Sequence, residues 1–426
     1  MLFVRSLATF QKPSTFAPIL SLLLSMINSG DTAFVLISSA LVAIMTPGLA
    51  FFYGGLVKRK NVLTIMMQSF ISMGVVTVLW TVLTFSLAFG NDIHGLIGGL
   101  SYFMMNGVGL EPSTVYGTTI PFFAFFVFQM MFAIITPALI TGAFTERMNF
   151  KSYLIFLVVW SLVVYAPLAH WVWGGGFIAK LGAIDFAGGT VVHISAGMAA
   201  LASVFVLGKR KRTEHMPHNI TYVALGAALL WFGWYGFNAG SALAANGIAA
   251  AAFANTDIAA SMAMVTWLFL SWLVDGRPSM VGALTGAVAG LVAITPAAGY
   301  VAPGGSLIIG VVAAVGCFYA IKFRISMGWD DALDVWGCHG VGGIIGSVLT
   351  GVFAVKSIGG FSGLLEGNTQ QFIANLEGTA ISAVYAFVVT FVVLSVMKVV
   401  MNVKVQLKEE EESLDRALHG EEAYAF

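Results

Sequence analysis

The segments DFAGGTVVH (residues 185–193) and DALDVWGCH (residues 331–339) each place a histidine eight residues after an aspartate, within stretches that are otherwise apolar. Ionisable side chains at membrane depth are costly and normally face the interior of a helix bundle, so they mark candidate functional sites. The same spacing in both halves of the chain predicts a duplicated fold, with His193 and His339 paired between the repeats. The alternative is two unrelated histidines, each satisfied by its own neighbours.

The composition is that of a protein that crosses a lipid bilayer many times. Hydrophobic residues make up 58% of the 426 residues and charged residues only 9%, and the mean hydropathy is +0.91. A soluble domain usually carries about a quarter charged residues. The net charge of zero gives no indication of nucleic-acid binding, and the two cysteines form neither a disulfide framework nor a metal-site spacing.

Windows of about 20 apolar residues, enough to cross a bilayer, predict eleven spans. These lie at residues 31–53, 62–89, 120–144, 152–173, 190–208, 220–241, 255–274, 279–297, 304–322, 335–354 and 372–402. The predicted domains are an N-terminal segment (1–30), a membrane domain (31–404) and a polar, acidic tail (405–426). Residues 1–30 are either a signal peptide, with PILSLLLSMI as its core, or a non-native extension before Met26.

Basic residues are concentrated in the loops that follow odd-numbered spans. These loops carry Lys58, Arg59, Lys60, Arg147, Lys151, Lys209, Arg210, Lys211, Arg212, Arg277, Lys322 and Arg324, whereas the other loops hold only Lys180 and Lys356. Because cytosolic loops are enriched in lysine and arginine, this asymmetry predicts a cell-membrane protein with its N-terminus outside and its tail in the cytosol.

A shared tetrapeptide supports the duplication. Ile-Thr-Pro-Ala occurs at residues 135–138 of span 3 and at residues 294–297 of span 8. Spans 1–5 and 6–10 are therefore the expected repeats, and five spans per repeat require the second copy to be inverted. The predicted fold is all-α, with eleven transmembrane helices, of which the last is long and stands outside the repeat.

The aspartates and histidines are expected to have different tasks. Eight residues of helix rise about 12 Å, so Asp185 and Asp331 should lie near span starts, where a carboxylate can cap exposed amides. This favours a structural role for both aspartates. The histidines should lie deeper, and two neutral imidazoles can share one N–H···N hydrogen bond. Such a pair suits a small polar solute.

Aromatic residues gather in three places: Trp231 to Ser241, which includes Trp234, the FQMMF segment with Phe132, and HWVWGGG with Trp173. Aromatic side chains are common both in the interfacial belts of membrane proteins and at pore constrictions. The residues alone leave both interpretations open.

The order of several long motifs resembles the ammonium transporter family (Amt/Mep/Rh), nearer its Amt/Mep branch. The resemblance runs from about residue 31 to the tail and rests on FFYGGLVKRKN (51–61), FQMMFA (128–133), GAFTER (142–147), HWVWGGG (170–176), GAIDFAGGTVVH (182–193), GWYGFNAGSA (233–242), ITPAAGY (294–300), DDALDVWGCHG (330–340) and HGEEAY (419–424). Trp336 departs from the pattern, since many members have phenylalanine there.

This resemblance implies a function and a set of site residues. Trp173, Ser241 and Phe132 correspond to an outer site that recruits ammonium, Phe132 and Phe237 to a phenyl gate, and His193 and His339 to twin histidines lining the pore. Asp185 corresponds to an aspartate that supports transport, and we assign Asp331 and Trp234 to the same supporting group. The implied assembly is a homotrimer with one pore per subunit, whose tail can meet a cytosolic PII signalling protein. Neither a cofactor nor an enzymatic reaction is implied.

A pore with an aromatic entrance and an apolar interior can select ammonium over potassium. An indole face attracts a cation by cation–π interaction, worth about 1–2 kcal/mol when partly desolvated, and an apolar pore penalises every ion. Ammonia is neutral, so a proton lost at the entrance would let it pass, with methylammonium as an analogue. Whether the histidines relay that proton stays open.

Two other classes compete with transport. His193 and His339 could be axial ligands of a membrane haem, although no second histidine pair is present. The chain could also be an ammonium sensor, which we rank lower because only residues 405–426 follow the last predicted span.

Overall fold

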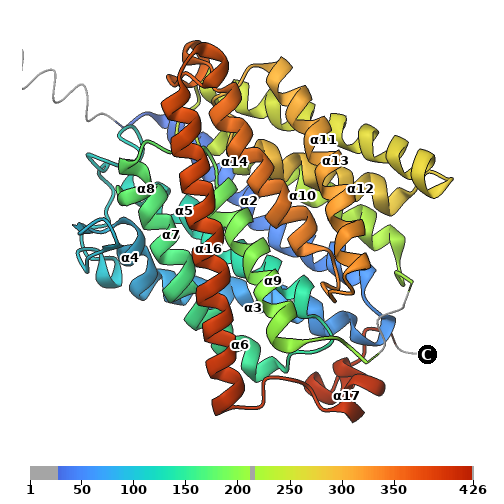
Figure 1. Ribbon diagram of the computed structural model, residues 1–426. Helices are drawn as coiled ribbons and strands as arrows, with labels where there is room; N and C mark the ends of the chain where they lie inside the picture. The colour runs from blue at the N-terminus through green and yellow to red at the C-terminus, as the bar shows by residue number, and fades with distance from the viewer. Residues whose placement is uncertain (1–26, 212–215, 425–426) are drawn as a thin grey trace, which may run out of the picture.

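The computed structural model describes residues 27–211 and 216–424. These residues form a bundle of helices whose only sheet within the described ranges is one two-stranded hairpin (Figure 1). The signal-peptide or extension hypothesis falls on residues 1–26, outside the described part, as do Arg212 and the last two residues of the tail.

Eleven helices or helix groups make up the bundle. They are α2 (Ser29–Leu56), α3–η2–α4 (Val62–Leu79, Trp80–Thr84, Phe85–Phe89), α5 (Phe122–Phe144), α6–η4–α7 (Phe150–Trp160, Ser161–Tyr165, Ala166–Val172), η5–α9 (Gly189–Ile194, Ser195–Leu207), α10 (Ile220–Gly240), α11 (Gly247–Asp275), α12 (Met280–Ile294), α13 (Pro303–Ser326), η6–α14 (Trp336–Gly340, Val341–Phe353) and α16 (Thr369–Val400).

Short elements lie in the connections between them: η1 (Arg59–Asn61), β1 (Asp92–Ile93), β2 (Ile97–Gly98), η3 (Phe103–Met105), α8 (Phe177–Lys180), α15 (Lys356–Gly359) and η7 (Leu364–Glu366). The tail after α16 carries α17 (Leu407–Glu411) and η8 (Asp415–His419). The antiparallel strands pair Asp92 with Gly98 and Ile93 with Ile97.

Each predicted span corresponds to one of these helices. Among the described residues, ten helices are long and apolar enough to cross a membrane, and α12 is a shorter apolar helix of 15 residues. All but one of the predicted starts lie within three residues of the observed ones. The first helix begins at Ser29, where Asn28 caps it through the Asp31 N–H. The exception is α11, which begins at Gly247 rather than residue 255. Its first turns are rich in alanine, which favours helix strongly but adds little hydropathy.

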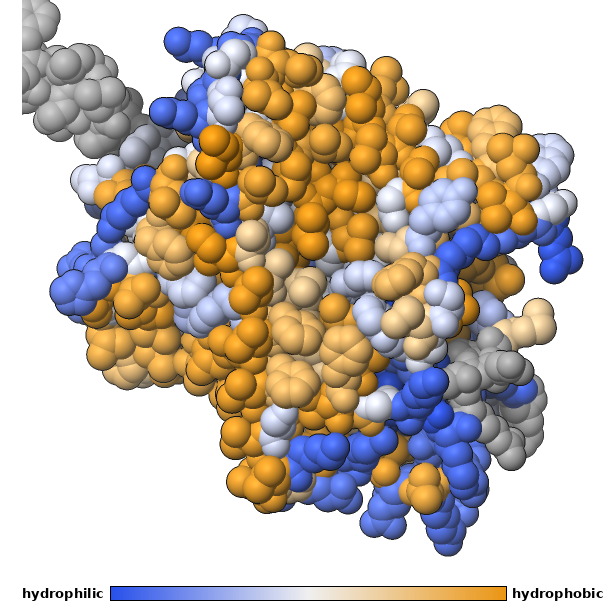
Figure 2. Space-filling model, in the orientation of Figure 1, coloured by the Kyte–Doolittle hydropathy of each residue, from blue (hydrophilic) through white to orange (hydrophobic). Residues whose placement is uncertain are grey.

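The outer surface is apolar where lipid would lie. Figure 2 shows apolar side chains over α16 and the helices beside it, and polar side chains gathered near the tail. On α16, Val384 and Val392 are 62% and 52% exposed. Exposed apolar area of this extent fits a hydrocarbon environment rather than water.

The basic loops gather at one end of the bundle, as the spacing of spans predicts. We call the end that carries residues 90–121 the loop face, and the end that carries the tail, residues 401–424, the tail face. Within the described residues Lys180 of α8 lies at the loop face, 2.6 Å from Asp92. Lys58 and Arg147 lie at the tail face, where the Val405 N–H bonds the Arg147 carbonyl at 2.9 Å.

The tail is ordered against the loops of its own subunit. Asp415 accepts the N–H groups of Leu63 and Thr64 at 3.0 and 2.8 Å, so it caps the start of α3. Leu414 is fully buried, and Tyr424 lies under the Arg59 guanidinium at 5.0 Å. Leu414 and Tyr424 thus attach the tail to the loop at Arg59 and Asn61 of the same chain.

Candidate functional site

The two histidines meet in the middle of the bundle. His193 lies in η5 and His339 in η6, and their Nδ1 atoms are 3.3 Å apart. Both side chains are buried. The predicted hydrogen-bonding distance between them is therefore confirmed. Both elements are π-helical turns, which are rare and frequent at functional sites, and their equivalent positions in the two halves match the predicted repeat.

A close crossing of the two helices brings the histidines together. Gly197 in the first turn of α9 contacts the Gly340 backbone, and any Cβ on Gly197 would overlap it. Small residues permit this approach in membrane bundles. The Asp-to-His spacing predicted the pairing, but the glycine contact could not be located without the fold.

Aromatic and hydroxyl groups fix the orientation of His193. Its ring stacks on Trp234 with centroids 5.4 Å apart and an angle of 26°. The Trp234 indole donates a hydrogen bond to the Thr295 hydroxyl at 2.9 Å, which ties it to the second ITPA segment. Trp234 therefore packs directly on His193 and is itself held by Thr295. The Nε2 atom of His193 is buried and has no partner within the described residues.

Two phenyl rings separate the histidines from the loop face. The centroids of Phe132 and Phe237 are 4.2 Å apart, and both side chains are buried. Trp173 meets Phe132 edge-on at 6.0 Å. The first two rings come from α5 and α10, which are not equivalent in the repeat, so tertiary packing alone brings them together.

A pocket of about 290 Å³ opens above these rings at the loop face. Its walls include Phe132, Trp173, Asp185 and Ser241, so all three residues of the predicted recruitment site share it. The Trp173 indole donates to the Asp185 carbonyl at 3.0 Å. The Ser241 hydroxyl donates to the Phe237 carbonyl at 2.9 Å, which leaves its oxygen able to accept a hydrogen bond.

The two aspartates cap their π-helical turns, as the spacing predicts, but to different extents. The Asp185 carboxylate accepts the N–H groups of Gly188, Gly189 and Thr190 at 2.7–2.8 Å and also the Thr190 hydroxyl. Asp331 accepts the Trp336 N–H at 2.7 Å, and no donor among the described residues lies within normal hydrogen-bonding distance and angle of its Oδ1. Burial raises the pKa of the Asp331 carboxyl.

Beyond the Phe132 and Phe237 rings, two further spaces lie toward the tail face. A cavity of about 20 Å³ is lined by Phe237, His193 and His339, a volume that suits one water-sized molecule. A pocket of about 230 Å³ beyond it is lined by His339, Asp334 and Cys338. The cavity and the tail-face pocket share wall residues, including Tyr53 and His339. Among the described residues the loop-face pocket shares none with the cavity, and the contact between the Phe132 and Phe237 rings lies between them.

This cavity is too small for a haem between the histidines. A macrocycle with its iron requires far more than the volume of one water molecule, and the 3.3 Å contact joins the imidazoles directly. The bis-histidine haem interpretation is therefore not supported.

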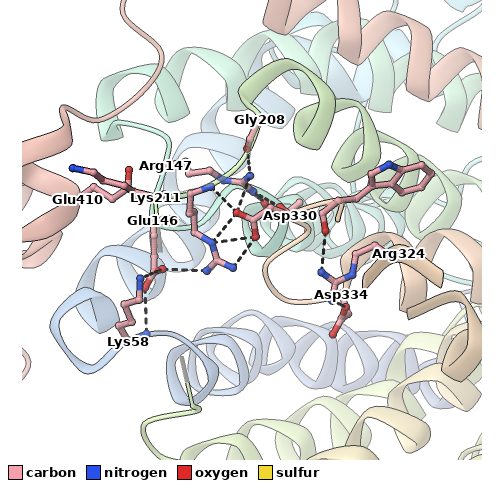
Figure 3. Close-up of polar contacts among 12 residues, drawn as sticks. Lys58, Glu146, Arg147, Gly208, Lys211, Arg324, Asp330, Asp334 and Glu410 are labelled. Carbon is pink, nitrogen blue, oxygen red and sulfur yellow. Dashed lines mark hydrogen bonds and ion pairs between the residues drawn. The ribbon is translucent and has the colours of Figure 1, made fainter. Parts of the chain in front are cut away.

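A buried ion-pair cluster joins the loops at the tail face (Figure 3). Arg210 bonds the Asp330 carboxylate at 2.8 and 3.0 Å and Glu146 at 3.1 Å, and Arg147 donates to the Asp330 carbonyl at 2.7 Å. Lys58 lies 3.2 Å from Glu146. Burial lowers the pKa of Arg147 to about 10. Burial alone would raise the pKa of Asp330, but Arg210 and Arg147 hold it below its ordinary value.

The sequence reasoning missed this cluster. Its basic members entered only as loop charges, and its acidic members, Glu146 and Asp330, only as letters of the motifs GAFTER and DDALDVWGCHG. The signal was their charge within motifs of otherwise apolar residues.

Comparison with known proteins gives a consistent result. A model of the Ammonium Transporter Family matches residues 33–424. The ammonium transporter of Bacillus subtilis (strain 168) is 48% identical over 401 residues, which cover 93% of this chain and 98% of the relative. The ammonium transporter of Aquifex aeolicus (strain VF5) is 50% identical over 402 residues, with 93% and 94% covered.

Solved structures agree. The crystal structure of Candida albicans Mep2 matches with a TM-score of 0.85 and 36% identity, over 90% of this chain and 88% of the other. A structure described as a sensor Amt protein matches with a TM-score of 0.84 and 27% identity, over 92% and 98%.

Proposed function

The chain belongs to the ammonium transporter family, and from this premise we propose that it binds ammonium in the loop-face pocket and conducts it as ammonia between His193 and His339. The observation that carries this proposal is the stacking order of the spaces: the pocket at Trp173 ends at Phe132, whose ring packs on Phe237 of the histidine cavity, and that cavity shares His339 with the pocket below it.

Recruitment rests on a cation–π face and an acceptor. Trp173 and Ser241 share one pocket, and ammonium offers four N–H donors to the serine oxygen and neighbouring carbonyls. Potassium has similar charge but donates no hydrogen bond. Cation–π attraction of about 1–2 kcal/mol in a partly desolvated pocket raises the local concentration of the cation but is weak enough to allow its rapid release.

Ammonium gives its proton to water in the loop-face pocket, and ammonia then passes the rings. Phe132 and Phe237 leave no polar surface at the gate, and an unpaired ion in such surroundings costs many kcal/mol. Neutral ammonia escapes that cost and finds imidazole nitrogens beyond the gate. The buried His193 Nε2 is one such group.

Orientation and assembly are part of the same proposal. Because the basic loops lie at the tail face, that face is cytosolic and the recruitment pocket faces outside. Three copies form the expected homotrimer, and the ordered tail is a regulatory segment accessible to a PII protein. Sensing is the second candidate, because one structural neighbour carries that description.

The test is uptake of labelled methylammonium into liposomes that contain the purified protein. We expect saturable uptake above that of protein-free liposomes, and a raised KM when Trp173 is replaced by alanine. Phe205→Ala, at a 44% exposed aromatic on α9, is the matched control. Binding of ammonium without uptake would favour the sensor.

A further inference from the structure

His170 is a fully buried histidine that sequence reasoning did not single out, although it opens the HWVWGGG motif. It lies in the last turn of α7, three residues before Trp173. Its Nδ1 is 2.9 Å from the Ala88 carbonyl oxygen, and its Nε2 is 2.9 Å from Oδ1 of Asp92. Both ring nitrogens therefore have a partner.

Both partners of the His170 ring can only accept hydrogen bonds. A carbonyl oxygen has no proton to give, and an ionised carboxylate has none either. Asp92 is ionised, because the hydrogen bond from Lys180, followed by that from His170, holds the pKa of its carboxyl well below the usual range. Each nitrogen of His170 must then donate, and an imidazole that donates from both nitrogens carries two protons and a positive charge.

These contacts join four separate elements at the loop face. Ala88 is in α4, Asp92 in β1, His170 in α7 and Lys180 in α8. Lys180 reaches the other oxygen of Asp92 at 2.6 Å. The Trp171 indole adds a bond to the Leu96 carbonyl at 2.6 Å. We call Asp92, His170 and Lys180 the loop-face clasp.

The clasp is continuous with the backbone that holds Trp173. The His170 carbonyl accepts the N–H groups of Gly174 and Gly176 at 3.0 and 2.9 Å. Gly174 passes so close to the His170 ring and the Ala88 carbonyl that a Cβ there would overlap both. Trp173 lies between these bonds and its own indole bond to Asp185, so its ring is held from two sides.

We propose that His170 is a doubly protonated positioning residue, which fixes Trp173 in the recruitment pocket through its bonds to Asp92 and Ala88. The proposal rests on the recruitment role of Trp173 given under the proposed function. Asp92 and Lys180 are the charged groups that face His170, and Tyr116 contacts the adjoining Gly174 carbonyl at 3.4 Å.

Two substitutions of His170 each remove one of its two ring hydrogen bonds. His170→Gln keeps a donor near the Asp92 position, and His170→Asn keeps one near the Ala88 position. We expect each to raise the KM for methylammonium by about tenfold, equivalent to about 1.4 kcal/mol, with the maximal rate within about twofold. Lys356→Gln is the control, because Lys356 is an exposed basic residue that belongs neither to the clasp nor to the walls of the recruitment pocket.

The direct test is nitrogen NMR of histidine-labelled protein in lipid nanodiscs at pH 8, with His170→Gln to assign the signal. We expect two protonated ring nitrogens for His170, and one after Asp92→Asn. A neutral His170 ring overturns the proposal. So does a protonated ring whose variants leave KM unchanged while Trp173→Ala raises it. If Trp173→Ala also leaves KM unchanged, Trp173 does not recruit ammonium, and a role for His170 in positioning it is contradicted as well. The NMR result still shows whether the His170 ring is charged.

Discussion

The hydrogen bond between His193 and His339 uses Nδ1 of both rings, so only one of the two can donate it. The other must accept, which fixes complementary tautomers for the neutral pair. The far nitrogen of His193 is then the group that a solute can meet. Loss of the shared bond should therefore affect transport more than the fold.

His193→Gln tests this bond. Glutamine places its amide near Nε2 but has no counterpart of Nδ1, so the bond to His339 is lost while the size changes little. We expect methylammonium uptake to fall by at least about tenfold, with a loss of stability of about 1–3 kcal/mol for the unpaired partner. Uptake into liposomes and thermal unfolding measure the two effects.

The control is His94→Gln, at an exposed histidine on the loop face. Its uptake should match the unsubstituted protein. If His193→Gln transports at the full rate, the twin histidines are ordinary core residues.

The gate rings make a second prediction at this scale. Phe237→Leu conserves volume approximately but removes the ring that packs on Phe132, so uptake should change at least about threefold while the protein stays folded. Phe237→Ala should change it more, at a stability cost of about 3–5 kcal/mol. Phe128→Leu, in a ring 4.9 Å from Phe132 but outside the pocket walls, should leave uptake unchanged. Equal uptake rates in all three variants would show that Phe132 and Phe237 do not form a gate.

At the scale of elements, hydropathy predicted the spans because each must bury a continuous apolar stretch. It could not predict the π-helical turns η5 and η6, since a one-residue change in helical repeat leaves no trace in hydropathy. Nor could it predict the Arg210–Asp330 pair, whose members are 120 positions apart. The histidine pair was predictable because repeated spacing carries information that a single motif lacks.

Loss of the carboxylate charge should have opposite effects on the stability of the protein at Asp185 and at Asp331. Asp185→Asn removes acceptor capacity from four donors and should destabilise the protein by about 1–3 kcal/mol. In Asp331, burial raises the pKa, so its contribution to stability is present below the ordinary carboxyl value and is lost as the pH rises through the raised value. Asp331→Asn should therefore be more stable than the unsubstituted protein at neutral pH.

The measurement is thermal unfolding of both variants from pH 4 to pH 8. The stabilisation by Asp331→Asn should shrink toward pH 4. A destabilisation at neutral pH equal to that of Asp185→Asn would show that the Asp331 charge is needed.

At the scale of the whole molecule, the tail connects the end of α16 to the start of α3. The Asp415 cap places a carboxylate at the positive end of a helix dipole, and Lys211 meets both Glu410 and Glu411. Arg210, the residue before Lys211, pairs with Asp330. Asp330 in turn precedes the segment that contains His339. A change at the tail thus has a short physical route to the pore.

Deletion of residues 405–426 should lower uptake without preventing assembly of the trimer. Asp415→Ala should reproduce part of the loss, because it removes the cap from α3. Lys408→Ala is the control, since the Lys408 side chain is 82% exposed. Uptake and size-exclusion chromatography with light scattering measure both properties. Full transport by the truncated protein would contradict a regulatory tail.

The central claim is that ammonium sheds a proton and crosses as ammonia, so that no ion passes the rings at Phe132 and Phe237. The most direct measurement compares ammonium and potassium entry into the same liposomes under equal inward gradients at one pH. The account predicts ammonium entry well above the protein-free level and potassium entry at that level. Potassium entry at a rate comparable with that of ammonium would contradict it.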